Sequence, residues 1–92
     1  MQTGLLWFDN SAERDLPTKV ADAARRYCEK FGVPPNTCYV NRAALGGGEL
    51  MVSGSGMPGG FRLTLRVLPA SNVLLHHFWV GIEDQAELRA AA

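Results

Sequence analysis

The run Val73-Leu74-Leu75-His76-His77-Phe78-Trp79-Val80-Gly81-Ile82 constrains the fold of this 92-residue chain more than any other segment. It is apolar except for two adjacent histidines at its centre. Neighbouring side chains of a β-strand point to opposite faces, so such a strand would be apolar on both faces. A strand of this kind is usually buried on both faces of its sheet. Either its own chain covers both faces, or its own chain covers one face and a partner covers the other.

The sequence offers one convincing helix to cover a sheet. Apolar residues recur at steps of three and four between positions 16 and 31 and form a single stripe: Leu16, Val20, Ala23, Ala24, Tyr27, Cys28 and Phe31. Asp15 can cap this helix, Pro17 suits its first turn, and Gly32 before a double proline ends it. We therefore predict a helix over residues 16–31, whose stripe, Phe31 included, supplies the main core layer.

Four further segments have the composition of strands. Residues 4–8 and 37–41 flank the helix, which predicts two parallel strands joined by a right-handed crossover. Residues 49–53 lie between glycine-rich stretches and are expected at a sheet edge. Residues 61–67 alternate between apolar and polar and lead through a four-residue connection into the apolar strand, which predicts an antiparallel hairpin.

These elements predict one α+β domain over residues 1–92. Its mixed sheet has the chain order β-α-β-β-β-β, with the main helix on one face. We expect the last three strands to form an antiparallel meander, and the apolar strand to lie between the first two, as in split strand–helix–strand folds. A helical turn at 42–45 and a short C-terminal helix from Asp84 complete the prediction.

Charge and composition argue against several classes of protein. Nine Lys and Arg balance nine Asp and Glu, so no long-range field draws the chain to nucleic acid or to acidic membranes. No secretory signal or membrane-length apolar run is present, and we expect a cytoplasmic protein without a membrane partner. Cys28 and Cys38 lack a second pair to complete a zinc site, so we expect no metal and two small core residues.

Two local patterns suggest chemistry, and neither is supported by its context. His76 and His77 point to opposite faces of a strand, so they cannot converge on one atom, and no acidic residue has a metal-type spacing with either. Residues 54–59 match the dinucleotide pattern G-x-G-x-x-G, but a strand follows them where a phosphate site needs a helix. We therefore predict no cofactor, and expect residues 54–60 to form a mobile loop.

Aromatic residues exceed what one helix can cover, and we expect Trp79 and Trp7 at a surface sealed by another chain. The leading hypothesis is a non-catalytic protein–protein interaction or assembly module that self-associates through an apolar sheet face. One alternative is a nucleic-acid-associated accessory protein using Arg62 and Arg66, which project from one face of the strand predicted at residues 61–67. Another is a small enzyme around His76 or His77, although catalysis is not favoured. The candidate binding residues are Trp79, His77, His76, Arg62 and Arg66.

Overall fold

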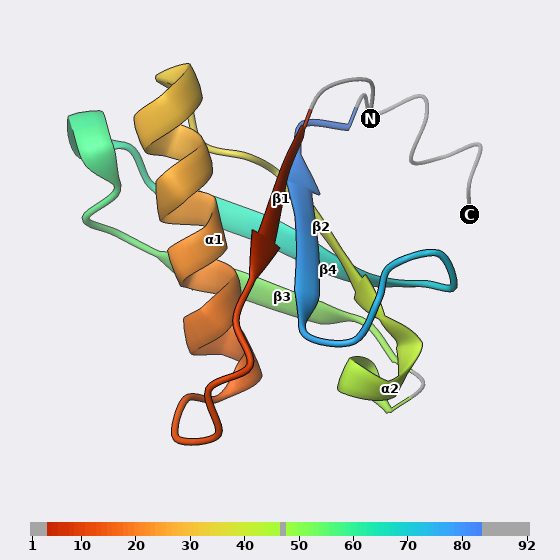
Figure 1. Cartoon of the computed structure of the whole chain (residues 1–92). Helices are drawn as coiled ribbons and strands as arrows, with labels where there is room; N and C mark the ends of the chain where they lie inside the picture. The colour runs from red at the N-terminus through yellow and green to blue at the C-terminus, as the bar shows by residue number, and fades with distance from the viewer. Residues whose placement is uncertain (1–3, 47, 84–92) are drawn as a thin grey trace.

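The computed structural model describes residues 4–46 and 48–83, which form a five-stranded mixed sheet with a long helix packed on one face (Figure 1). The elements, in chain order, are β1 Gly4–Phe8, α1 Leu16–Phe31, β2 Thr37–Asn41, α2 Arg42–Leu45, β3 Leu50–Gly54, the 3-10 turn η1 Pro58–Gly60, β4 Leu63–Ala70 and β5 His77–Gly81. The predicted α+β class and the order of its strands are confirmed. The predicted C-terminal helix lies outside the described residues.

The strand order across the sheet is β1-β5-β2-β4-β3. β5 is antiparallel to both of its neighbours, so β1 and β2 run parallel to each other with β5 between them. β2 is parallel to β4, and β3 is antiparallel to β4 at the far edge. The split strand–helix–strand arrangement and the edge position of β3 were both predicted from the sequence, and both are confirmed.

The predicted hairpin between β4 and β5 is wrong, because β2 lies between these two strands. The register of β2 against β4 runs from Thr37 opposite Arg66 to Asn41 opposite Ala70. The chain leaves β4 at Ala70, and residues 71–76 carry it past the end of β2 into β5. Six extended residues span about 20 Å, twice the roughly 10 Å that separates strands with one strand between them.

The apolar strand is also shorter than the ten residues predicted. Residues 74–77 form a turn, in which the backbone N–H of His77 donates to the carbonyl oxygen of Leu74 at 3.1 Å. His76 takes a φ of 66°, which interrupts the extended conformation. Leu74 therefore lies 71% exposed, outside the sheet. The expected alternation of faces holds from His77 onward, where Phe78 and Val80 enter the core.

Helix α1 has the predicted bounds because both ends are capped. The Asp15 carboxylate accepts a hydrogen bond from the Thr18 N–H at 2.9 Å. Gly32 adopts φ 81° and its N–H donates to the Cys28 carbonyl at 2.8 Å. The buried helix residues are Val20, Ala23, Ala24, Tyr27 and Cys28.

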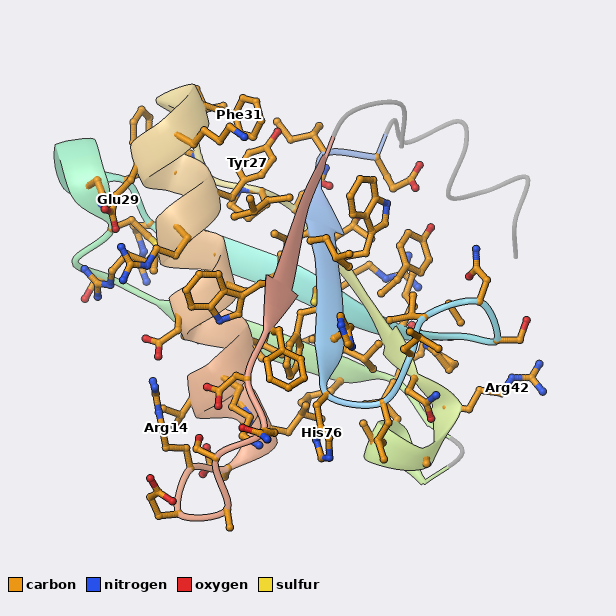
Figure 2. The ribbon with its side chains drawn as sticks, viewed as in Figure 1. Arg14, Tyr27, Glu29, Phe31, Arg42 and His76 are labelled. Carbon is orange, nitrogen blue, oxygen red and sulfur yellow. The ribbon has the colours of Figure 1, made fainter. Side chains whose placement is uncertain are left out.

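The prediction that Phe31 lies in the core is wrong, because this side chain is 37% exposed. Phe31 is the last residue of α1, and Figure 2 shows it beside Tyr27 at the end of the helix. Its ring centroid lies 4.5 Å from that of Tyr27. The apolar stripe of α1 is therefore buried from Val20 to Cys28 and partly exposed at Phe31.

The core fills the space between α1 and the sheet. Cys28 and Cys38 are buried there as unpaired thiols, as predicted, and burial raises the pKa of the Cys38 thiol to about 12. The core also includes Met57, which is 5% exposed. Two residues of α1 hold the loop around it, since Arg25 donates to the Gly56 carbonyl and the Cys28 thiol to that of Pro58. The loop predicted at residues 54–60 therefore has one side chain, that of Met57, in the core.

Candidate interaction surface

The sheet face opposite α1 is called the open face here. Alternation along each strand defines it, because the neighbours of its residues pack into the core under α1. Its main side chains are Leu6 and Phe8 from β1, His77 and Trp79 from β5, Tyr39 from β2, and Arg66 and Leu68 from β4. Leu6 and Phe8 are 58% and 52% exposed, and Met51 of β3, which lies opposite Arg66 on the same face, is 55% exposed.

The strand registers align four of these side chains in one row, called the apolar row below. Leu6 lies opposite Trp79, Trp79 opposite Tyr39, and Tyr39 opposite Leu68. Directly opposite residues have Cβ atoms about 5 Å apart, so their side chains contact across the strands. The row therefore crosses β1, β5, β2 and β4 as a continuous, largely apolar band.

A hollow of about 520 Å³ lies along this row. Leu6, Trp79 and Tyr39 of the apolar row form one side of it. The β4–β5 connection forms another through Asn72, Val73 and Leu74. Glu83 stands at one end, where its carboxylate accepts a hydrogen bond from the Tyr39 hydroxyl at 2.9 Å. The hollow therefore combines an aromatic wall with a buried carboxylate.

The Asn36 side chain positions Glu83. Its Oδ1 accepts from the Glu83 N–H at 2.8 Å, and its Nδ2 donates to the Glu83 carbonyl at 3.0 Å. These two bonds continue the β2–β5 ladder past the end of β5, with a side chain in place of a backbone. Sequence reasoning missed this residue, since an asparagine after two prolines looks like an ordinary turn residue.

His77 lies on the open face, as predicted for one of the two histidines. Its Nδ1 hydrogen-bonds the Leu75 carbonyl at 3.0 Å, and its ring lies 4.9 Å from that of Phe8. Glu83 also borders the larger hollow, but it follows the far end of β5.

His76 lies at the end of the sheet where β5 begins (Figure 2). It borders a smaller hollow of about 220 Å³, beside Lys19 of α1 and part of His77. Among the described residues, no carboxylate lines this hollow, and no group of three or more His, Cys, Asp or Glu could hold a metal ion. Within the described part of the chain, no metal-ligand set therefore surrounds the histidines.

The two candidate arginines do not share a strand face. β4 begins at Leu63, so Arg62 precedes the strand, whereas Arg66 projects onto the open face. The Arg66 Nη2 lies 2.7 Å from Glu49 Oε1, so a carboxylate already neutralises this guanidinium. The expectation that the two arginines project from one face of a strand is wrong, because the strand starts two residues later than predicted.

Trp7 lies on the helix face, and the expectation that another chain seals it is wrong. Its side chain packs against the core, with the Arg26 guanidinium 5.3 Å from the ring centroid. Its neighbours Leu6 and Phe8 take the open face instead. Alternation along β1 separates these residues onto two faces. The segment is too short and too uniformly apolar for its sequence to show which residues face the helix.

None of the helices in the described part of the chain has the length and hydropathy needed to cross a bilayer. Comparison of the chain with protein-family models, with curated proteins and with solved structures gives no match.

Proposed function

We propose that this protein is a non-catalytic assembly module that associates with a second copy of itself through the open face. The observation that carries the proposal is the apolar row, which crosses four strands on the face that α1 does not cover. Large contiguous apolar surfaces on small domains mark interaction sites, because exposing them to water is costly.

The dimensions and charge of the molecule fit self-association. The molecule measures 36 × 33 × 19 Å, so either broad side offers more than the roughly 800 Å² that each partner contributes to a standard interface. The formal net charge is zero, so two copies approach without repulsion. A chain of this length also has a modest core, and association adds to the apolar area it buries.

Sedimentation velocity at micromolar concentration tests the proposal. We expect a dimer or larger species that persists at high salt, because screening weakens contacts between charges and leaves apolar contacts in place. The matched variants are Phe8→Ser on the open face and Phe61→Ser, which is 41% exposed and precedes β4. Phe8→Ser should weaken association and Phe61→Ser should not. A monomer at every concentration and salt would overturn the proposal.

A further inference from the structure

Strand β1 forms one edge of the sheet, and within residues 4–46 and 48–83 no segment pairs with its outer side. The strand reads Gly-Leu-Leu-Trp-Phe and contains neither a charge nor a proline, the residues that usually prevent an edge from pairing with another chain. The opposite edge differs, since Glu49 stands beside β3 and pairs with Arg66 of β4. The two edges are therefore not equivalent as docking sites.

The hydrogen-bond pattern shows which backbone groups of β1 point outward. The Asp9 N–H donates to the His76 carbonyl at 3.0 Å, which makes these residues a hydrogen-bonded pair. Such pairs alternate along an antiparallel ladder, so Trp7 and Leu5 also bond to β5. The N–H and C=O groups of Gly4, Leu6 and Phe8 consequently face away from the sheet. The same three residues lie on the open face.

We infer that β1 pairs antiparallel with β1 of a second copy, about a two-fold axis at Leu6. This inference rests on the self-association proposed above and places the contact at the β1 edge of the open face, where Leu6 and Phe8 project. Leu6 of one copy lies opposite Leu6 of the other, and Gly4 lies opposite Phe8 in both directions. Each of these pairs uses outward-facing backbone groups on both sides, so the edge is complementary to itself, as a two-fold interface requires.

The side chains fit this register. Position 4 has no side chain, and the Trp79 ring lies beside it. The Phe8 ring of the second copy, placed opposite Gly4, therefore meets the Trp79 ring, and an aromatic residue opposite a glycine is a favourable cross-strand pair. The Leu6 pair also joins the two apolar rows, so that one band runs from Leu68 of one copy to Leu68 of the other.

Stacking two open faces directly is less favourable than edge pairing. It would bury the ion pair between Arg66 and Glu49, which is partly exposed to water, and desolvating two charges offsets much of the gain from apolar burial. Edge pairing leaves this ion pair in water, three strands away from β1. It engages Leu6 and Phe8, which are both more than half exposed on the open face.

Two variants separate edge pairing from face stacking. Leu6→Pro removes an N–H that points outward and makes no bond within the monomer, and proline is tolerated on an edge strand. Leu68→Lys places a charge on the open face far from β1. We expect Leu6→Pro to weaken the dimer about 100-fold, from two lost bonds at roughly tenfold each, and Leu68→Lys to leave it intact. Circular dichroism and thermal unfolding check that both variants fold.

Cysteine cross-linking tests the register without a proline. Opposite residues in a hydrogen-bonded pair have Cα atoms about 5.5 Å apart, within the range of a disulfide. Leu6→Cys should therefore form a covalent dimer on mild oxidation, whereas Met51→Cys on β3 should not. Cys28 and Cys38 are buried and do not compete.

The outcomes distinguish the inference from the proposed function. A dimer that Leu6→Pro abolishes, that Leu68→Lys retains and that Leu6→Cys cross-links supports the inference. A dimer that survives Leu6→Pro and dissociates with Leu68→Lys overturns edge pairing and leaves self-association through the open face standing. A wild-type chain that is monomeric at all concentrations overturns both.

Discussion

The indole ring of Trp79 fills the space that a side chain on Gly4 would need. A Cβ atom built on Gly4 would lie 2.9 Å from Trp79 Cζ2 and 2.7 Å from the Val80 carbonyl oxygen. Trp79 lies directly opposite Leu6, so its ring reaches diagonally along β1 to the glycine. The glycine thereby fixes how the central aromatic residue of the open face lies on the sheet.

Gly4→Ala should lower the free energy of unfolding by about 1–3 kcal/mol, because the added methyl group overlaps both a ring and a backbone oxygen. Urea unfolding measures this change. Gly54→Ala is the matched control, since no atom lies within 4 Å of a Cβ at that position, and its effect should stay within about 0.5 kcal/mol. Equal effects of the two substitutions would contradict the described contact between Trp79 and Gly4.

Tyr27 and Phe31 should differ in their contribution to stability, although they lie one turn apart on the same stripe. Tyr27 is buried in the core, so Tyr27→Ala should cost about 3–5 kcal/mol through lost burial and the cavity it leaves. Phe31 is partly exposed beside it, so Phe31→Ala should cost about 1 kcal/mol. Chemical denaturation of the two variants gives the comparison. A larger loss from Phe31→Ala would show that the last turn of α1 is buried.

The contrast between Tyr27 and Phe31 shows which features of the fold the sequence pattern can predict. The helix and its ends were predictable because capping by Asp15 and Gly32 is local. Phe31 continues the same periodicity, but its burial depends on where the sheet ends beneath the helix. The position of β5 between β1 and β2 was predictable from its apolar character, since an interior strand buries the most.

The false hairpin and the shortened β5 have separate causes. A short connection between two strands usually means a hairpin, but β2 competes for the same edge of β4 and forms the parallel pair instead. Leu74 and Leu75 look like strand residues in the sequence, and nothing local marks the positive φ of His76. The residues of the open face were equally hard to predict from the sequence, because Tyr39 and Leu68 join Trp79 only through pairings between distant segments.

Met57 and Met51 provide a matched test of the glycine-rich loop. Met57 belongs to the core, so Met57→Ala should lower stability by about 2–5 kcal/mol. Met51 is 55% exposed on β3, and Met51→Ala should change stability by about 0.5 kcal/mol or less. Thermal or urea unfolding distinguishes them. A negligible effect at Met57 would restore the picture of a loop that moves independently of the core.

His76 should be replaceable by glycine with a gain in stability. Its φ of 66° is a left-handed conformation, which glycine adopts without the steric cost that a Cβ atom imposes. Part of that gain is lost to the greater freedom of glycine in the unfolded chain, so we expect about 0.5–1 kcal/mol from His76→Gly. His76→Val should destabilise, because a β-branched residue tolerates this conformation poorly. A loss of stability with glycine would mean that the imidazole makes contacts worth more than the strain.

Asp15 should make the stability of the protein depend on pH in the acid range. Hydrogen bonds from the hydroxyl and the backbone N–H of Thr18 hold the pKa of this carboxyl below its ordinary value. The folded state therefore binds fewer protons than the unfolded chain, so the contribution to stability is complete above about pH 4 and is lost as the pH falls through the folded pKa. Asp15→Asn keeps an oxygen that can accept the Thr18 N–H but does not titrate. The stability of Asp15→Asn, measured by unfolding from neutral to acid pH, should equal that of the wild type near neutrality. It should fall less steeply below about pH 4, the range in which the carboxyl of the unfolded chain titrates. Parallel curves throughout would show that the cap contributes equally in both protonation states.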